Sequence, residues 1–502
     1  MQKAAFRRLC ALAALAPFSY AAHAAPGCAA VEAFLEGKAT GVICFRSDDL
    51  RTNNAVTTPP DNSIKTFADG SPLPGLSNGL ASFTPTKDRG VISNGPTATT
   101  AKIPGIQVEG WFADDPSKEA RFLLRFPDGW NGKLVVAGAS GTRSEYNGDF
   151  AWSDYVLPKG YAYASQNKGV LNVYLPALQA ADPLACRLNP ISPTWVHFYD
   201  NDPEKPFTQW TQYMLKTAEM AQRAVKATYN KSPRKTYAVG TSNGGYQVRR
   251  AVEAAPDLFD GGVDWEGTYI DASRANILID LPAALKNFPA YRDSGYDPDS
   301  QAAKNIIAAG YPPDIVKRDA TGAFVDSLWL HYWAEFWEVT ACQWQKRFDP
   351  TYATYVAGLD NYDYLSRRAV PGVFDAVNAV ATTGKIKKPL ITVAGTMDAL
   401  LPIRHQARAY EAAVDGSRKG NNDRREAQYR LYEVQNGNHI ESYIPLFSQL
   451  REIQPYAHKA FDLLVAHVED NAPLPPSQCI PKGGAISPNP SEPGNCAQLL
   501  AP

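Results

Sequence analysis

The stretch TYAVGTSNGGYQ, Thr236–Gln247, places one serine inside a cluster of small residues directly after an apolar, β-branched run. The run predicts a buried strand, and residues 245–255 predict a helix. A sharp strand-to-helix turn strains the backbone of the turn residue, which then needs small neighbours two positions away on either side. Gly240 and Gly244 occupy those positions around Ser242, so the spacing G-x-S-x-G predicts a nucleophile elbow. The alternative is a glycine turn that only caps a helix.

Strands and helices are expected to alternate around this elbow. Short apolar segments bounded by Gly, Pro, Asn or Asp predict strands, among them GIQVEGWF, ARFLLRF, KLVVAGA, GYAYASQ, FDGGVDW and KPLITVAG. The segment FTQWTQYMLKTAEMAQRAVKATYN has apolar residues at helical spacing and predicts a crossover helix before the elbow strand. This alternation predicts an α/β fold with a mostly parallel sheet and helices on both faces.

The N-terminus resembles an export signal. Basic Lys3, Arg7 and Arg8 precede the apolar run LCALAALAPF and the tripeptide Ala-His-Ala of residues 22–24, after which we expect cleavage. The chain therefore divides into a signal peptide (1–24), an N-terminal loop-rich segment (25–104), the first part of an α/β core (105–267), a lid insertion (268–385), the second part of the core (386–470) and a C-terminal tail (471–502). The expected location is secreted or periplasmic.

Composition narrows the possible partners. The formal net charge of -1 gives no reason to expect a nucleic acid partner. No run after the signal approaches the ~18 apolar residues of a membrane helix. No Cys/His spacing resembles a zinc site, and the acidic residues of the lid lack the spacing of an EF-hand loop, so we predict neither metal nor cofactor. The sequence says nothing of the oligomeric state.

Six cysteines remain after the signal, an even number that predicts three disulfides in an oxidising compartment. Proximity in sequence favours Cys28–Cys44 and Cys479–Cys496, which leaves Cys186–Cys342. The last pair would join the body to the lid. Free buried thiols are the alternative.

A serine hydroxyl becomes a nucleophile when a base takes its proton and a third group holds that base. In folds with this elbow, the acid and then the histidine follow the serine along the chain. Asp398 lies in GTMDALLP after one expected strand, and His439 lies in NGNHIE after the strand-like AQYRLYEVQ. We therefore expect Ser242 as nucleophile, His439 as base and Asp398 as the orienting acid.

Other residues compete for these roles. Asp398 could only cap the helix that follows it, and Asp264 or Glu266 could be the acid instead. Four other histidines are less well placed for the expected order: His197, His405, His458 and His467.

The same chemistry needs two N–H donors that face the oxyanion. One should be the backbone N–H of Asn243, directly after the nucleophile. The other should come from the loop VVAGASGTRSEYN, where Ser140 or Gly141 is our choice over Gly138 and Ala139.

The lid segment is longer than a simple crossover requires. It contains SLWLHYWAEFWEVTACQW, whose aromatic residues have helical spacing. Most of these aromatics are expected in the core of the lid, with contact to substrate as the alternative. The residues that we name for substrate contact are Trp265, Glu266, Trp333 and Trp337.

From Trp130 to His439 the chain resembles the α/β-hydrolases, and more narrowly the tannase and feruloyl esterase family. The segments that carry the resemblance are WNGKLVVAGASGT, KGYAYASQNKG, TSNGGYQ, DLFDGG and GTMDALLP. The family has a cysteine before the serine and another after the histidine, whereas Thr241 and Ile440 stand there. Around the elbow the chain is also similar to secreted hydrolases of 3-hydroxybutyrate oligomers, and the motifs do not separate the two groups.

The resemblance implies an α/β-hydrolase fold and an exported serine esterase that acts on small esters, aromatic ones first, through an acyl-enzyme. Hydrolysis of 3-hydroxybutyrate oligomers or polyester fragments is the alternative, and a peptidase is a more distant one. A hydrolase-fold binding protein without turnover is the non-enzymatic alternative, which the intact order of serine, acid and histidine disfavours.

Overall fold

The computed structural model describes residues 27–51, 101–115, 119–141, 145–146, 149–170, 173–176, 184–197, 207–274, 276–418 and 428–502. The expected signal peptide lies outside these residues, and so does most of the expected loop-rich segment. No helix in the described ranges combines the length and apolar character required to cross a bilayer.

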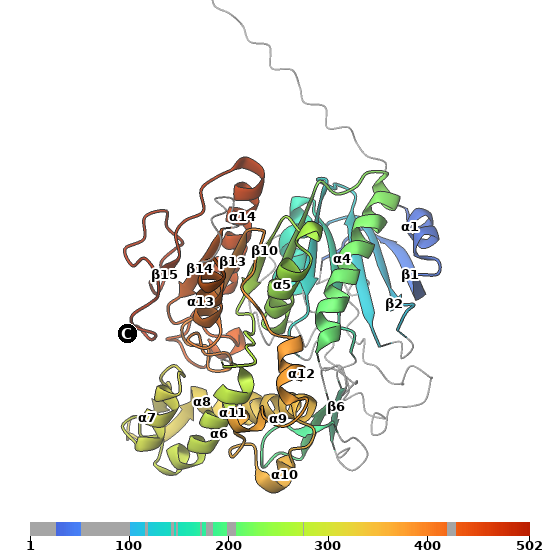
Figure 1. The fold of residues 1–502 in the computed structure, drawn as a ribbon. Helices are drawn as coiled ribbons and strands as arrows, with labels where there is room; N and C mark the ends of the chain where they lie inside the picture. Colours follow the sequence, from blue (N-terminus) through green and yellow to red (C-terminus); the bar gives the residue numbers. More distant parts are fainter. Residues whose placement is uncertain are drawn as a thin grey trace, which may run out of the picture.

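A ten-stranded sheet runs through the molecule (Figure 1) in the order β1-β2-β3-β5-β4-β9-β10-β13-β14-β15. Neighbouring strands from β5 to β15 are parallel, whereas β1, β2 and β3 form an antiparallel edge. The expected mostly parallel sheet is thus confirmed. The strands are β1 (Ala39–Ser47), β2 (Gly105–Phe112), β3 (Arg121–Pro127), β4 (Lys133–Gly138), β5 (Ala162–Gln166), β9 (Lys235–Thr241), β10 (Gly261–Trp265), β13 (Leu390–Gly395), β14 (Tyr429–Val434) and β15 (Gln478–Ile480).

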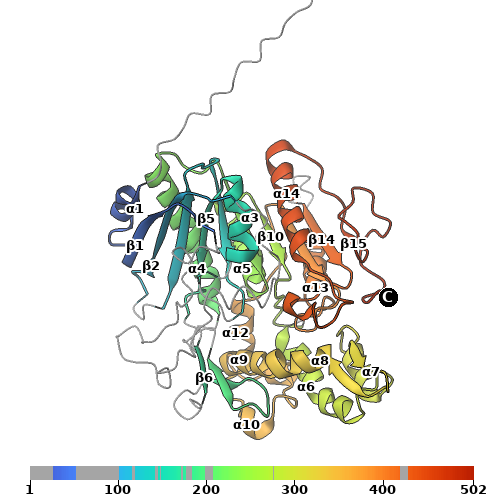
Figure 2. The same ribbon diagram turned by 180° about the vertical axis from the view of Figure 1, so that it is seen from behind.

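Helices cover both faces of the sheet because successive side chains of each strand point to opposite sides. On β4, Leu134 and Val136 pack in one apolar core, and Val135 and Ala137 pack in the other. The first core lies under α1 (Cys28–Leu35), α4 (Thr208–Tyr229), α5 (Asn243–Ala254) and α13 (Ala407–Arg418). The second core lies under η1 (Asp149–Ser153), α3 (Asp154–Val156) and α14 (Gln454–Asp470), which Figure 2 shows from behind.

The segment expected to form a lid makes up a layer beyond one end of the strands (Figures 1 and 2). Its apolar core includes the buried side chains of Trp329, Trp337 and Trp344 and continues into the body through Tyr246 and Ile440. Its elements are α6 (Ile277–Asp293), α7 (Gln301–Ala308), the hairpin β11 (Val316–Arg318) and β12 (Phe324–Ser327), α8 (Leu328–Tyr332), η4 (Trp333–Trp337), α9 (Glu338–Phe348), α10 (Thr354–Ala357), α11 (Tyr364–Arg367) and α12 (Val373–Ala379).

A small antiparallel sheet borders the lid. It consists of β6 (Val173–Pro176), β7 (Cys186–Arg187) and β8 (Thr194–His197). A disulfide links Cys186 on β7 to Cys342 on α9, with 6.0 Å between the Cα atoms. The other two expected pairs, Cys28–Cys44 and Cys479–Cys496, are also disulfides in the structure.

Sequence patterns missed two regular segments at the ends of the chain. Residues 27–51, which lie in the expected loop-rich segment, contain α1 and the edge strand β1. The expected tail contains β15, which pairs in parallel with β14. Only three residues long, β15 is too short for the alternation that identifies a strand in sequence.

Candidate active site

Ser242 lies at a sharp turn between β9 and α5. Its φ of 58° and ψ of -123° are unusual for a residue with a side chain, and its N–H is held by Trp265 O at 2.8 Å. A Cβ atom on Gly244 would lie 2.6 Å from Gly138 O, and one on Gly240 would collide with the backbone of Gly244. The two glycines therefore let the turn and the end of β4 approach each other, as the G-x-S-x-G spacing requires.

A continuous line of hydrogen bonds joins the three residues expected to form a triad. Ser242 Oγ lies 3.0 Å from His439 Nε2, and His439 Nδ1 lies 2.8 Å from Asp398 Oδ2. All three side chains are buried. Because β9, β13 and β14 are parallel and close in the sheet, the loops at their carboxyl ends meet at one edge. The geometry is that of a serine, a base and an acid in line.

Asp398 also stabilises its own loop. Its Oδ1 accepts hydrogen bonds from the N–H groups of Leu400 at 2.8 Å and Leu401 at 2.7 Å. These bonds close a tight turn and do not cap a helix, because the next helix, α13, begins only at Ala407. The other oxygen faces His439, so the helix-capping alternative is wrong.

The candidate oxyanion donors lie on both sides of Ser242. Asn243 is the first residue of α5, where a backbone N–H has no partner four residues earlier, and its side-chain Oδ1 accepts from Thr268 Oγ1 at 3.0 Å. In the loop after β4, the N–H of Ala139 donates to Gln247 Oε1 at 2.9 Å. That bond occupies the Ala139 N–H, and the N–H groups of Ser140 and Gly141 stay our candidates.

Lys168, which the sequence analysis did not consider, lies under this loop. The lysine side chain is buried, and its Nζ donates to the carbonyl oxygens of Ser140 at 2.7 Å and Gly141 at 2.6 Å. In a trans peptide the C=O of one residue points away from the N–H of the next, so the bonds from Lys168 to Ala139 O at 3.3 Å and to Ser140 O turn the N–H groups of Ser140 and Gly141 to the opposite side. Only the adjacency of β4 and β5 brings Lys168 to this loop, so no local pattern could indicate it.

Glu266, expected to contact substrate, lies against the histidine instead. Its Oε2 is 3.3 Å from His439 Nδ1, and its Oε1 accepts from Gly395 N–H at 3.0 Å. Burial, and then the adjacent Asp398 carboxylate, raise the pKa of Glu266 well above the ordinary value of a glutamic acid. Asp264, the other alternative acid, pairs with Arg249 and caps Gly267 N–H at 2.6 Å. It does not serve His439.

The three tryptophans named for substrate contact are packed in the interior. Trp265 has no exposed surface and packs edge-on against Trp152. Trp333 stacks on Phe288, with ring centroids 5.2 Å apart. Trp337 donates its Nε1–H to Ala399 O at 2.8 Å, in the loop that carries Asp398. These contacts correct the expectation for Trp265 and Trp337, whose burial assigns them to packing.

The other histidines with described side chains have structural contacts. His458 packs on Tyr155 and bonds to Ala151 O, and His467 Nδ1 bonds to Ala472 O at 2.8 Å. His405 lies in a turn before α13, not on a helix, 3.5 Å from Asp280. The side chain of His197 lies outside the described part of the chain.

Glu266, Asp398 and His439 could also be read as metal ligands, because their ligand atoms lie within 4.8 Å of one another. Asp398, however, uses one oxygen for two amides and the other for His439. The hydrogen bonds of a triad therefore account for this cluster.

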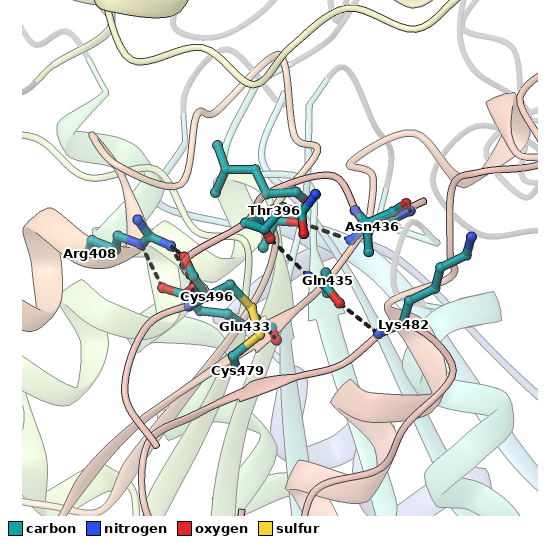
Figure 3. The surroundings of a disulfide bond; sticks show 11 residues. Thr396, Arg408, Glu433, Gln435, Asn436, Cys479, Lys482 and Cys496 are labelled. Atoms are coloured by element: carbon teal, nitrogen blue, oxygen red, sulfur yellow. Dashed lines mark hydrogen bonds and ion pairs between the residues drawn. A yellow bond between two sulfur atoms is a disulfide. The ribbon is translucent and has the colours of Figure 1, made fainter. Parts of the chain in front are cut away.

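The C-terminal tail supports the loops that carry the acid and the histidine (Figure 3). Glu433 at the end of β14 accepts from Arg408 Nε at 2.7 Å and from Cys496 N–H at 2.6 Å, beside the Cys479–Cys496 disulfide. Asn436 exchanges hydrogen bonds with Ala501, at 2.7 and 3.0 Å, three residues before His439. The tail therefore holds the turn after β14 in place.

The proteins that this chain resembles in sequence differ from those that it resembles in structure. Residues 355–499 match the family model of the 3HB-oligomer hydrolases. Curated D-(-)-3-hydroxybutyrate oligomer hydrolases of Burkholderia thailandensis and Burkholderia vietnamiensis are 37% and 36% identical over 120 and 115 residues. Each match spans 22% of this chain and 16% of the relative.

Similar solved structures include feruloyl esterase B from Aspergillus oryzae, at a TM-score of 0.46 and 13% identity over 88% of this chain and 90% of that one. They also include the tannin acyl hydrolase of Aspergillus niger, at a TM-score of 0.44 and 11% identity over 82% and 86%. The sheet, the elbow and the flanking helices of this chain have the architecture of an α/β-hydrolase fold, and residues 355–499 resemble the 3HB-oligomer hydrolases.

Proposed function

We propose that this chain is an exported serine hydrolase of carboxylic esters. The observation that carries the proposal is the line of two hydrogen bonds from Ser242 through His439 to Asp398. Ser242 Oγ attacks the ester carbonyl carbon while His439 Nε2 takes its proton. The N–H of Asn243 and an amide of the Ser140–Gly141 loop stabilise the tetrahedral oxyanion.

The second half of the reaction uses the same groups. His439 returns the proton to the alcohol as the C–O bond breaks, which leaves an acyl group on Ser242. Water then attacks the acyl carbonyl, His439 takes the proton from that water, and the acid leaves with Ser242 restored. Asp398 keeps the imidazole oriented and stabilises its charged form.

We further propose short oligomers of 3-hydroxybutyrate as the substrate class. The support is the match of residues 355–499, which contain both Asp398 and His439, to the 3HB-oligomer hydrolase family. This proposal reverses the order of the two substrate classes that the sequence led us to expect. Aromatic esters become the second class, and a panel of a hydroxybutyrate dimer, methyl ferulate and methyl gallate separates them by kcat/KM.

The enzymatic proposal is tested by burst release of p-nitrophenol from p-nitrophenyl butyrate. We expect a burst that approaches one equivalent per chain, and a Ser242→Ala variant should lose on the order of 10⁶-fold in kcat with its fold intact. The unchanged melting temperature of the variant serves as the control. Activity of the variant within tenfold of the parent chain would exclude the proposal.

Export is supported by the three disulfides, which form and persist in oxidising compartments. The expected signal peptide predicts that the mature chain begins at Ala25. N-terminal sequencing of protein recovered outside the cytoplasm tests this point.

A further inference from the structure

Two buried carboxyl groups face the same nitrogen of His439. Its Nδ1 lies 2.8 Å from Asp398 Oδ2 and 3.3 Å from Glu266 Oε2. A serine, histidine and aspartate suffice for the proposed reaction, so the triad leaves the second carboxyl without a role. Its position therefore needs a separate explanation.

The sheet places Glu266 at this point. Glu266 directly follows β10 and Asp398 lies in the loop after β13, and these strands are parallel neighbours, with Trp265 opposite Val393. Glu266 adopts a φ of 53°, a backbone conformation that is strained for a residue with a side chain. Its N–H donates to Val393 O at 2.8 Å and holds the strained residue in place.

The two carboxyl groups differ in their hydrogen bonds. Asp398 accepts two backbone amides on Oδ1 in addition to His439, whereas Glu266 accepts one amide, from Gly395 at 3.0 Å. Amide donors favour the ionised form of a carboxyl group. Ionising two adjacent carboxyl groups in a buried site is costly, and the two amide donors at Asp398 favour the negative charge there over Glu266.

The surrounding charges point the same way. Besides Asp398, the nearby acidic group is Glu441, two residues after His439, whose Oε1 accepts the N–H groups of Ile453 at 2.7 Å and Gln454 at 2.9 Å. Burial, Asp398 and Glu441 all raise the pKa of Glu266, against which the amide of Gly395 acts. Burial and the neighbouring carboxyl groups thus favour the protonated form of Glu266.

We propose that Glu266 is a second acid of the site: a neutral positioning residue beside ionised Asp398, which becomes the ionised partner of His439 Nδ1 when Asp398 is neutralised. This inference rests on the proposed function. It involves no new bond, only a change in which carboxyl group holds the proton.

The proposal predicts a specific non-additivity. In Asp398→Asn the neighbouring negative charge is gone, so Glu266 ionises and takes over the orientation of the imidazole. We expect a loss of about 10²-fold in kcat/KM, where the loss in a triad without a second acid is about 10⁴-fold. Glu266→Gln alone should cost a few-fold, because an amide resembles a protonated carboxyl group in shape. The double variant should lose about 10⁴-fold, far more than the product of the single losses.

The experiment measures the four proteins of this cycle in two ways: by kcat/KM on p-nitrophenyl butyrate and by the rate at which a fluorophosphonate labels Ser242. The pH profile gives a further readout. Activity of Asp398→Asn should rise with pH through the ionisation of Glu266, and this rise should be absent from the double variant. Asp314→Asn is the matched control, because this carboxyl group accepts from Tyr291 and Ser327 in the lid and its change should have the same effect with and without Asp398.

The outcomes separate the two proposals. Wild-type protein that neither hydrolyses the ester nor reacts with the fluorophosphonate contradicts the proposed function. Wild-type protein that reacts normally, with equal effects of Glu266→Gln in both backgrounds, contradicts the role of Glu266 alone. A loss above 10³-fold in Glu266→Gln by itself would show that Glu266 is the working acid, and would also overturn the proposal. Melting curves and fluorophosphonate labelling are measured for each variant, so a variant that fails to fold is recognised. In that case Glu266→Ala replaces Glu266→Gln, alone and combined with Asp398→Asn, and the comparison is repeated.

Discussion

Ser242 and Glu266 adopt φ angles of 58° and 53°, although neither is a glycine. The strain at Ser242 lifts its Oγ toward His439, and the strain at Glu266 turns a carboxyl group toward the same ring. Both residues are held by backbone bonds to neighbouring strands, Ser242 to Trp265 O and Glu266 to Val393 O. Strain at single residues is thus supported by the sheet and is concentrated at the candidate site.

His458, away from this site, makes the stability of the fold depend on pH. Burial lowers its pKa to about 4, because the packed surroundings disfavour the charged imidazole. In the unfolded chain, His458 binds a proton below about pH 6.5, whereas in the folded chain it binds one only below about pH 4. The contribution of neutral His458 is fully present above pH 6.5 and is lost as the pH falls through this window.

We therefore expect His458→Gln to flatten the dependence of stability on pH. Between pH 7 and pH 5 the parent chain should lose about 2 kcal/mol more unfolding free energy than the variant, measured from denaturant midpoints. Asp280, whose pKa burial raises to about 6, contributes with the opposite sign and is common to both proteins. His467→Gln on the same helix is the control, and equal slopes for the parent and His458→Gln would contradict the assignment.

At the scale of elements, hydrogen bonds from neighbouring parts of the chain support the loops after β4, β13 and β14. Lys168 binds the carbonyls of the loop after β4, Glu266 binds the last residue of β13, and the C-terminal tail binds the turn after β14. Catalytic groups on loops gain precision only when such contacts fix the backbone. Removing one of these supporting contacts should therefore lower kcat.

Lys168→Met should release the loop that contains Ser140 and Gly141. Because a lost oxyanion donor costs about 10²–10³-fold, partial misplacement of one amide should lower kcat roughly tenfold or more, with little change in KM. Lys133→Met is a matched control at the other end of β4, where Lys133 pairs with Glu469 at 2.7 Å. Equal kcat values for Lys168→Met and Lys133→Met would show that the carbonyl contacts do not position the site.

The disulfide in the C-terminal tail gives a second prediction at the scale of elements. Cys479→Ser with Cys496→Ser opens a loop with a sequence separation of 17 and should destabilise the fold by about 3 kcal/mol in the chain-entropy model. Because Cys496 N–H also binds Glu433, kcat should fall as well, several-fold at a temperature where the protein stays folded. Cys28→Ser with Cys44→Ser, whose separation of 16 is similar, is the control that should affect stability alone.

At the scale of the whole molecule, the lid is tied to the site at several points. Tyr332 of α8 donates its hydroxyl to Asn438 Oδ1 at 2.9 Å, next to His439, and Trp337 binds the loop of Asp398. Tyr246 of α5 donates to Val380 O at 2.7 Å, at the end of the lid. The lid and the catalytic loops therefore form one packed unit, with a shared apolar core.

The Cys186–Cys342 disulfide acts at this scale because it closes a loop with a sequence separation of 156 that contains Ser242. In the chain-entropy model such a closure contributes about 5 kcal/mol, which native strain reduces. We expect Cys186→Ser with Cys342→Ser to melt at least several degrees lower. Peptide mapping of the non-reduced protein should recover the linked pair, and recovery of either residue as a free thiol would contradict it.

The sequence by itself determined the elbow, the alternation of strands and helices, and the order of Ser242, Asp398 and His439. These features are local patterns or follow from chain order, since a sharp turn needs its own glycines and a half-buried strand needs its own alternation. The cysteine pairs at the two ends were also accessible, because partners that are close in sequence meet easily. Short β15 and edge strand β1 were not, because their pairing is supplied by neighbours distant in the chain.

Only the tertiary structure decided which side chains support the triad. Glu266 reaches His439 because β10 lies beside β13, and Lys168 reaches the oxyanion loop because β5 lies beside β4. Packing against the sheet buries Trp265, and the core of the lid buries Trp337, although the sequence had suggested both for substrate contact. The sequence pattern of a residue at the end of a strand is the same whether its side chain faces a substrate or a catalytic residue. The order of the strands in the sheet decides which of the two it faces.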